Sequence, residues 1–254
     1  MYILVTNDDG IDSEGLLLLK QALAKVGEVA IIAPDHNWST AGHTKTIQRP
    51  LRVNQVRLAD GDVAYSTDGT PSDCVSLGVL GILERKPDLV VAGINKGPNL
   101  GDDVTYSGTV AAAMEGIISG IPSIAISLAD YTKWDFTYAA QFAAQLAQHV
   151  MGNGLGSDVL LNVNVPSVPR SKIVGVEITR LGKRVYRDVL IEHRDSTGQL
   201  YYRIGGDVPS GLPLEGTDFK AITENKISIT PIHLDLTNHQ LIEHLRSWKL
   251  NPHS

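Results

Sequence analysis

The 254-residue sequence contains a single cysteine, Cys74, which excludes an internal disulfide. Chains without disulfides are typical of reducing compartments. The N-terminus lacks the basic segment of a signal peptide, and its apolar run is too short for one. No other run approaches the roughly 20 apolar residues that cross a bilayer. We therefore expect a cytoplasmic protein with no membrane partner.

Basic residues are also few, because the 22 Lys and Arg residues are outnumbered by 28 Asp and Glu residues, which gives a net charge of -6. A general nucleic-acid-binding protein would normally present a basic face, so we expect neither DNA nor RNA as a specific partner. A phosphorylated small substrate is not excluded, since a bound cation can reverse the local sign of the charge. The hydrophobic content of 43% is ordinary for a globular chain long enough to bury a large core.

Short β-branched runs alternate along the chain with segments whose apolar residues recur at helical spacing. The predicted strands are Tyr2–Thr6, Val29–Ala33, Val63–Ser66, Asp88–Ala92, Ser123–Ser127, Val159–Val165 and Val174–Thr179. The predicted helices are Ser13–Val26, Ser72–Glu84, Thr109–Ser119 and Phe136–Met151. Nearly continuous apolar strands are typical of parallel sheets covered on both faces. The alternation predicts an α/β fold with a Rossmann-like, doubly wound and mostly parallel sheet over residues 1–180 of a single domain.

The sequence changes in character after about residue 180. Val185–Ile204 is polar and alternating, with a turn at Asp195–Gly198, which predicts an antiparallel β-hairpin. We assign residues 181–215 to a protruding arm that contains this hairpin. Residues 216–254 would then supply a strand, Lys226–Ile232, and a terminal amphipathic helix, Asn238–Trp248. The arm would serve either in assembly or as a lid, and its composition leaves both open.

Four polar clusters follow predicted strands or open a predicted helix. They are Asn7–Gly10, Pro34–His43, Gly93–Asp103 and Tyr106–Thr109. Ligands of open α/β sheets bind beyond the carboxyl ends of the strands. We therefore expect these clusters, which are distant in sequence, to meet at one edge of the sheet.

Asp8 and Asp9 are adjacent carboxylates at the end of a predicted buried strand, where burial is costly without a compensating positive charge. Such oxygen ligands suit a hard divalent cation, and Ser39, Asn95 and Asn99 could complete its shell. The alternative for an isolated Asp-Asp-Gly is that Asp8 caps the next helix and Asp9 is a solvated turn residue. The other polar clusters at the same edge favour the cation.

Ser107-Gly108-Thr109 opens an Ala-rich helix whose first backbone N–H groups form an anion site. Gly108 would let an anion approach the backbone closely. The alternative is an ordinary N-cap without a ligand. Beside a cation, this segment and Asn99 would hold a phosphate group.

His43 could act as an acid or base at this edge, and a hydrogen-bonded structural histidine is an equal alternative. Lys45 and Lys96 could contact a phosphate, although most lysines are solvated surface residues. Cys74 lies inside a predicted helix, which favours a core residue over a nucleophile. The sequence has no P-loop, no dinucleotide fingerprint after the first strand and no G-x-S-x-G elbow.

Several segments together resemble the SurE family of stationary-phase survival proteins, which are metal-dependent 5'/3'-nucleotidases. They are NDDG, APDHNWS with AGHTKTI, GTPSDCV, PDLVVAGINKGPNLGDDVTYSGTVAAAMEG, and GTDFKAI with ISITPIHLDLT. The resemblance spans nearly the whole chain, and its longest block, Pro87–Gly116, is highly specific.

The resemblance implies a Rossmann-like core that hydrolyses nucleoside monophosphates with one divalent metal ion per subunit, usually magnesium or manganese. Some members also cleave short polyphosphate. The family's metal ligands map onto Asp8, Asp9, Ser39 and Asn95, and its pattern places an anion near Ser107-Gly108-Thr109. Members form dimers or tetramers in which the hairpin and the C-terminal segment exchange between subunits, so we expect a homo-oligomer. Position 96 varies within the family, so Lys96 could tune substrate choice.

We therefore expect metal-assisted hydrolysis of a phosphomonoester, in which Asp8 or Asp9 orients or deprotonates the attacking water. An enzyme with an aspartyl-phosphate intermediate is a second hypothesis, but adjacent aspartates fit it poorly because neighbouring extended residues point to opposite sides. A non-catalytic nucleotide sensor on the same scaffold is the alternative from another class.

Overall fold

The structure, a computed structural model, describes residues 1–185, 188–206, 210–248 and 250. Its main sheet contains β1 (Tyr2–Thr6), β2 (Glu28–Pro34), β3 (Val53–Arg57), β4 (Val63–Thr67), β5 (Leu89–Lys96), β6 (Ser123–Ala129), β7 (Leu160–Pro166), β8 (Gly175–Ile178) and β13 (Lys226–Ile232). The strand order across this sheet is β3-β4-β2-β1-β5-β6-β7-β13-β8.

The six strands from β4 to β7 in this order run parallel to one another. β3 pairs antiparallel with β4 and β13 pairs antiparallel with β7, and β8 then joins the edge parallel to β13. The chain builds outward from β1 in one direction through β2 and in the other through β5. The topological switch point therefore lies between β1 and β5, and the doubly wound, mostly parallel α/β fold is confirmed.

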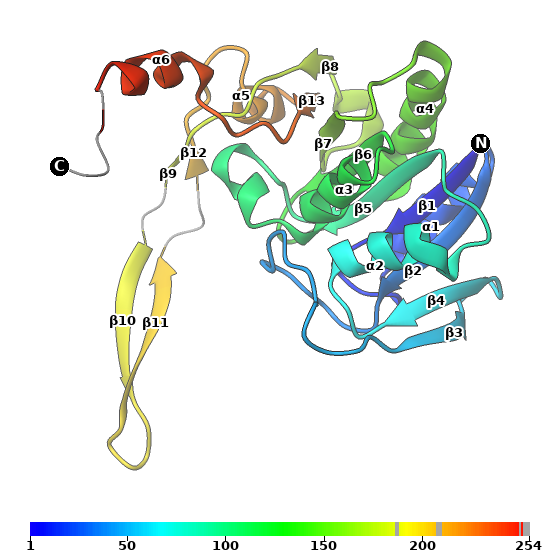
Figure 1. Cartoon of the computed structure of the whole chain (residues 1–254), viewed down its shortest axis with the longest axis horizontal. Helices are drawn as coiled ribbons and strands as arrows, with labels where there is room; N and C mark the ends of the chain where they lie inside the picture. Colours follow the sequence, from blue (N-terminus) through cyan, green and yellow to red (C-terminus); the bar gives the residue numbers. More distant parts are fainter. Residues whose placement is uncertain (186–187, 207–209, 249, 251–254) are drawn as a thin grey trace.

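Helices cover both faces of the sheet (Figure 1). Helices α1 (Glu14–Leu23) and α4 (Thr137–Asn153) pack side by side on one face, and α2 (Pro71–Leu77) and α3 (Gly108–Ile118) pack on the other. The alternation of β1 explains this, because Ile3 and Val5 join the apolar cluster of α1 while Tyr2 and Leu4 join that of α2.

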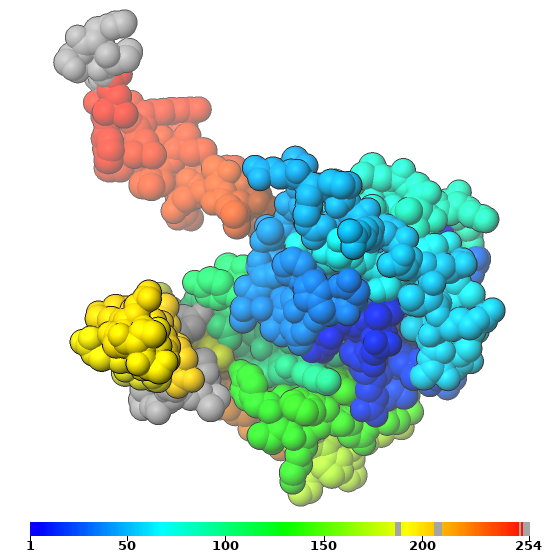
Figure 2. Space-filling view, turned by 90° about the horizontal axis from the view of Figure 1, so that it is seen from below, coloured from blue at the N-terminus to red at the C-terminus, as the bar shows by residue number. Residues whose placement is uncertain are grey.

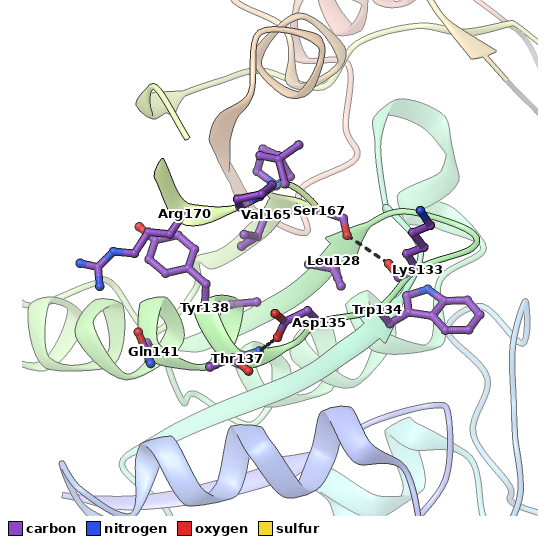
Figure 3. A pocket seen from close by; sticks show the side chains of 14 residues that line it. Leu128, Lys133, Trp134, Asp135, Thr137, Tyr138, Gln141, Val165, Ser167 and Arg170 are labelled. Atoms are coloured by element: carbon purple, nitrogen blue, oxygen red, sulfur yellow. Dashed lines mark hydrogen bonds between the residues drawn. The ribbon is translucent and has the colours of Figure 1, made fainter. Parts of the chain in front are cut away.

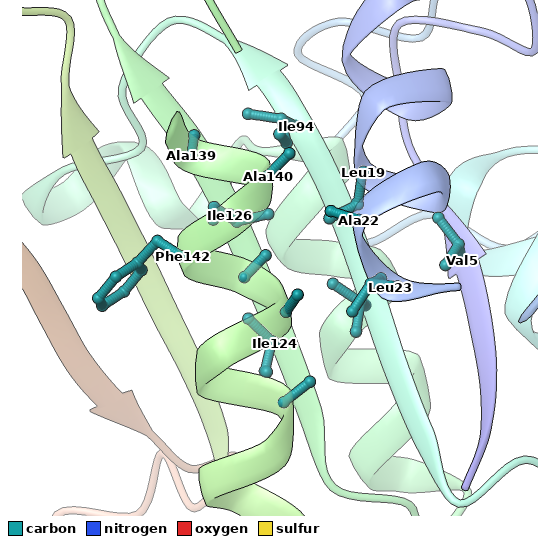
Figure 4. Close-up of a cluster of buried hydrophobic side chains, with 14 of the residues drawn as sticks. Val5, Leu19, Ala22, Leu23, Ile94, Ile124, Ile126, Ala139, Ala140 and Phe142 are labelled. Carbon is teal, nitrogen blue, oxygen red and sulfur yellow. The ribbon is translucent and has the colours of Figure 1, made fainter. Parts of the chain in front are cut away.

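The core under α1 and α4 is built from large side chains of the sheet and of α1, together with several alanines and Phe142 of α4 (Figure 4). Leu19 of α1 and Ala140 of α4 point toward Ile94 and Ile126 of the sheet. Gly15 brings α1 against β5, since a Cβ there would lie 2.4 Å from the Ile94 carbonyl oxygen. The close packing fixes the carboxyl end of β5, which carries Asn95.

Strand β5 is longer than the predicted strand Asp88–Ala92, because it continues to Lys96 into the polar cluster Gly93–Asp103. The register between β5 and β6 shifts between Ala92 and Asn95, and pairing then resumes at Asn95–Ser127. A bulge of this kind re-aims the following side chains and is not visible in an apolar pattern. A short 3-10 helix, η2 (Gly101–Thr105), follows.

The predicted helix Ser72–Glu84 is also wrong in extent. Helix α2 ends at Leu77, and a π-helical turn, η1 (Gly78–Ile82), contains Gly81 with a φ of 143°, outside helical conformation. Helix α2 begins at Pro71, one residue before the predicted start, with Thr70 as its N-cap, and Cys74 is fully buried. Burial raises the pKa of the Cys74 thiol, which suits a core residue.

Strand β3 and helix α5 (Asp218–Thr223) were not predicted. β3 is an edge strand with mostly exposed polar residues, and α5 has only six residues, so neither carries a long apolar pattern.

The predicted hairpin is present as β10 (Asp188–Arg194) and β11 (Leu200–Gly206). Asp195 orders its turn, because its Oδ1 accepts from the backbone N–H of Thr197 and Gln199 at 2.8 and 3.0 Å. Short strands β9 (Arg184–Val185) and β12 (Ser210–Gly211) pair at its base. Residues 186–187 and 207–209 of the predicted arm lie outside the described residues.

Two elements project from the body of the molecule, the hairpin and the segment that leads into α6 (His239–Ser247) (Figures 1 and 2). α6 matches the predicted terminal helix, and none of its side chains is buried. β13, which precedes it, lies inside the main sheet. The C-terminal segment therefore first contributes a strand to the main sheet and then projects from the body as α6.

Candidate functional site

A cavity of about 760 Å³ lies at the switch point of the sheet. Six of the residues predicted from the sequence line it: Asp8, Ser39, Asn95, Lys96, Asn99 and Ser107. They come from the carboxyl ends of β1 and β5, the segment after β2 and the start of α3. The predicted meeting of these distant segments is confirmed.

Asp8 is 4% exposed, and its Oδ1 accepts a hydrogen bond of 2.5 Å from the Thr109 hydroxyl. Burial raises the pKa of Asp8 to about 6, although the Thr109 hydrogen bond opposes the shift. Within the described ranges no basic side chain forms an ion pair with this carboxylate. The next helix, α1, is capped by Ser13, so Asp8 is not its N-cap.

The first turn of α3 packs directly against Asp8. A Cβ at Gly108 would lie 2.7 Å from the Asp8 Cβ and 3.0 Å from its Oδ2. Ser107 is the N-cap, and its hydroxyl oxygen accepts from the Val110 N–H at 3.1 Å. The predicted anion cradle and the predicted cation ligand are therefore neighbours.

Asp9 is less buried than Asp8 and contacts the end of β5. Its Oδ2 accepts from the Lys96 backbone N–H at 3.3 Å, and its Oδ1 accepts from Asn37 Nδ2 at 3.5 Å. Burial raises the pKa of Asp9, and the charge of Lys96 partly opposes this. The Lys96 ammonium lies 5.5 Å from the Trp134 ring centroid.

Asn95 and Asn99 are held by amide hydrogen bonds. Asn95 Nδ2 donates to the Gly97 carbonyl at 2.9 Å, so its Oδ1 is left for another partner. Asn99 donates from its backbone N–H to Asn164 Oδ1 at 2.8 Å and from Nδ2 to the Ser127 hydroxyl at 2.8 Å. These buried partners on β6 and β7 fix the orientation of the Asn99 side chain.

Ser39 lies in the exposed segment after β2. Its N–H donates to Asn37 Oδ1 at 2.6 Å, and the Gly42 N–H donates to the Tyr106 carbonyl at 2.9 Å. The second bond ties this segment to the residue before the α3 cap. Ser39 thereby lines the same cavity as Asp8.

His43 and Lys45 do not line the cavity, and for His43 this agrees with the alternative of a hydrogen-bonded structural histidine. Both contact Glu115 of α3, with His43 Nε2 3.3 Å from Oε2 and Lys45 Nζ 2.7 Å from Oε1. The Ser76 hydroxyl also donates to Oε1, at 2.7 Å. Burial opposes ionisation of Glu115, but these hydrogen bonds outweigh it and lower its pKa to about 2.

Among the lining residues that were not predicted as site residues are Arg184, Tyr106 and Tyr131. Arg184 enters from β9 at the base of the arm and pairs with Asp103, with Nη2 and Oδ2 2.7 Å apart. Nothing in the sequence signals this contact, because it depends on how the arm folds back. Tyr106 belongs to the predicted polar cluster Tyr106–Thr109, but the sequence does not indicate that its ring faces the cavity.

A second cavity, of about 670 Å³, lies between the start of α4 and the ends of β6 and β7 (Figure 3). There the Arg170 guanidinium lies 5.3 Å from the Tyr138 ring centroid, and Asp135 Oδ1 accepts from the Thr137 N–H at 3.0 Å. None of the predicted site residues lines it. The first cavity is therefore the candidate site.

The fold and this cavity define a doubly wound α/β protein with a polar, oxygen-rich site at the carboxyl edge of its sheet. The sequence model of one family, described as survival protein SurE, matches residues 3–188. The chain belongs to this family. No helix in the described part of the chain has the length and apolar content to traverse a bilayer.

Similar proteins match over nearly their whole length. A protein of Herpetosiphon aurantiacus named 5'-nucleotidase SurE is 52% identical, over 96% of this chain and 97% of its own. One of the same name from Chloroflexus aggregans is 50% identical, over 98% and 99%. The crystal structure of the SurE protein from Aquifex aeolicus superposes with a TM-score of 0.85 at 40% identity, covering 98% of this chain and 100% of that one.

Proposed function

We propose that the protein is a metal-dependent 5'-nucleotidase that hydrolyses nucleoside monophosphates to nucleoside and phosphate. The relatives that carry the name 5'-nucleotidase are close and collinear with this chain, which supports the reaction class. The observation that carries the proposal is the Asp8 carboxylate, buried at the floor of a nucleotide-sized cavity without a basic partner among the described residues.

The residues present fit a hard divalent cation. Asp8, Ser39 and Asn95 line one cavity and Asp9 adjoins Asp8, so carboxylate, hydroxyl and amide oxygens come together there. Magnesium and manganese prefer such ligands. No group of three or more His, Cys, Asp or Glu side chains suited to a metal occurs in the described residues, and the proposed set needs only two carboxylates. We propose one such ion per subunit.

A bound divalent cation would neutralise phosphoryl oxygens and lower the pKa of an adjacent water. The chain itself orients the reacting groups. The Thr109 hydroxyl holds the Asp8 carboxylate through Oδ1, and Gly108 leaves the side of Oδ2 without a side chain. The N–H groups at the start of α3, together with Asn99, would hold the remaining phosphate oxygens as charge shifts during reaction.

Asp8 and Asp9 are the candidate bases for the attacking water. A carboxylate that binds a cation directly is a poor base, so the aspartate that binds it less directly would take the proton. The same recognition of a phosphoryl group would admit 3'-monophosphates and short polyphosphate, because only the terminal phosphate needs to reach Asp8.

The test is a phosphate-release assay over nucleoside monophosphates and polyphosphate, with magnesium, manganese or chelator. We expect chelator to abolish release and Asp8→Asn to reduce it at least about 100-fold, since loss of cation stabilisation removes several kcal/mol from the transition state. Asp12→Asn, on an exposed aspartate nearby, is the matched control and should keep full activity.

Near-normal turnover of Asp8→Asn with magnesium would contradict the proposal, provided that circular dichroism shows both variants folded. AMP binding without phosphate release under every metal condition would instead favour the nucleotide sensor.

We also propose that the protein forms a homo-oligomer, a dimer or tetramer, through the hairpin and α6. Both elements project from the body and expose apolar side chains, among them Leu190, Tyr202, Leu241 and Leu245. Such side chains on projecting elements favour contact with a second copy of the chain.

A further inference from the structure

The candidate cavity has two chemically different regions. The residues that share the cavity with Asp8 are mostly polar, with amide, hydroxyl and ammonium groups, whereas Tyr106, Tyr131 and Ile204 supply large apolar surface to the same cavity. These three side chains are 59%, 49% and 76% exposed. Scattered exposed apolar residues are normal, but several that line one cavity mark a binding surface.

Tyr131 is held in place at this cavity. Its ring lies on Gly97, since a Cβ there would be 3.4 Å from Tyr131 Cε1. Its hydroxyl oxygen accepts from Arg184 Nη2 at 3.3 Å. The loop that follows is ordered by Asp130, whose Oδ1 accepts from the Thr132 N–H at 2.7 Å. A ring fixed from several sides loses little entropy when a ligand stacks on it.

Tyr106 is fixed through its backbone. Its N–H donates to the Asp103 carbonyl at 3.0 Å, and its carbonyl accepts from the Gly42 N–H at 2.9 Å. It immediately precedes Ser107, the cap of α3. The ring therefore starts one residue from the proposed phosphate cradle, within the span of a nucleotide.

Arg184 adds a polar group to this region. Its side chain is 5% exposed and pairs with Asp103. In the part of the chain that the structure describes, its Nε–H is buried without a hydrogen-bond partner. A buried donor of this kind is costly unless an acceptor satisfies it, and a ligand oxygen in the cavity would do so.

We infer that Tyr106 and Tyr131 form the nucleobase-binding subsite of this cavity and select nucleotides over other phosphomonoesters. The inference rests on the proposed function, which places the phosphate at Asp8. Stacking on an aromatic ring is tolerant of base identity, because every base has a π-face. The subsite therefore favours a broad range of nucleoside monophosphates over esters that lack a base.

The test compares AMP with ribose 5-phosphate, which carries the same phosphate ester without the base. A base-stacking residue contributes about 1–3 kcal/mol, so Tyr106→Ala and Tyr131→Ala should each raise KM for AMP by about 5-fold to about 150-fold. Their kinetics with ribose 5-phosphate should stay unchanged. Tyr106→Phe and Tyr131→Phe keep the ring and should restore the KM for AMP.

Tyr201→Ala is the matched control, because Tyr201 is a similarly exposed tyrosine, 51%, on the hairpin and does not line the cavity. Equal losses with both substrates, or no change in either variant, would overturn the subsite while leaving the nucleotidase intact. If the wild-type protein releases no phosphate, the proposed function fails instead. In that case the affinity for adenosine is measured by calorimetry. We expect weaker binding by the two alanine variants than by the wild type, and equal affinities would overturn the subsite.

Discussion

Gly108 lies against the carboxylate on which the proposed chemistry depends. A methyl group there would come within 2.7 Å of the Asp8 Cβ, and Asp8 is buried on its other sides, so the carboxylate or the helix start must move. A displacement of about 1 Å in a catalytic group can cost about 100-fold in rate. We therefore expect Gly108→Ala to lower kcat/KM for AMP by about 100-fold, measured by phosphate release.

The matched control is Gly152→Ala in α4, where a Cβ would meet nothing within 4 Å. It should keep full activity and gain about 0.5–1 kcal/mol in the free energy of unfolding, because alanine replaces glycine within a helix. Full activity of Gly108→Ala would show that the contact with Asp8 does not position the carboxylate.

Some residues of the site could be identified from their immediate neighbours in the sequence, and others could not. Asp8, Asn95 and Ser107 were identified because each belongs to a polar cluster that follows a predicted strand or opens a predicted helix, where polar residues stand out. Arg184 and Tyr131 were not, since an arginine in the arm and a tyrosine in a loop have ordinary surface surroundings in the sequence. Only packing brings them to Asp8.

At the scale of elements, Glu115 connects α3 to α2 and to the segment that carries Ser39. Its carboxylate accepts from Ser76 of α2 and from Lys45, and it contacts His43. Its pKa is lowered from 4.5 to about 2. The ionised carboxylate therefore stabilises the folded state above pH 4.5, and this contribution is lost as the pH falls through 2.

We expect the free energy of unfolding to fall between pH 5 and pH 2 by about 3 kcal/mol more in the wild type than in Glu115→Gln. Urea unfolding across this pH range measures the difference. Glu84→Gln, on an exposed glutamate, should follow the wild-type curve. Parallel curves for the wild type and Glu115→Gln would exclude this stabilisation.

The bounds of two elements differ from the prediction because a bulge or a glycine interrupts a segment whose apolar residues otherwise form a regular pattern. The shift between Ala92 and Asn95 lets β5 continue beyond the apolar run that predicted it. The conformation of Gly81 ends helical structure inside a run of apolar residues that read as one helix. The shift in β5 depends on its pairing with β6, which the local sequence does not contain, whereas at Gly81 a glycine adopts a positive φ that side-chain-bearing residues rarely adopt.

At the scale of the whole molecule, α6 presents an apolar face on which no side chain is buried in the part of the chain that the structure describes. Leu241, Leu245 and Trp248 recur at helical spacing and are 45%, 41% and 55% exposed. We expect the wild type to sediment as a dimer or tetramer. The double variant Leu241→Lys and Leu245→Lys should shift toward the monomer, because it places charge on the apolar face.

Sedimentation velocity at micromolar concentration measures the shift, and Gln240→Lys, exposed on the same helix, should leave the assembly unchanged. A wild type that sediments as a monomer would contradict this use of α6. The cytoplasmic location and the identity of the metal stay predictions.

The sequence by itself determined the doubly wound α/β fold, the hairpin and the residues that meet around Asp8. These features follow from local periodicity and from the rule that parallel strands present their carboxyl ends at one edge. Only the tertiary structure decided that His43 and Lys45 pair with Glu115 and that Arg184 and two tyrosines complete the cavity. Long side chains reach partners that are set by packing between distant segments, and no periodic pattern encodes such contacts.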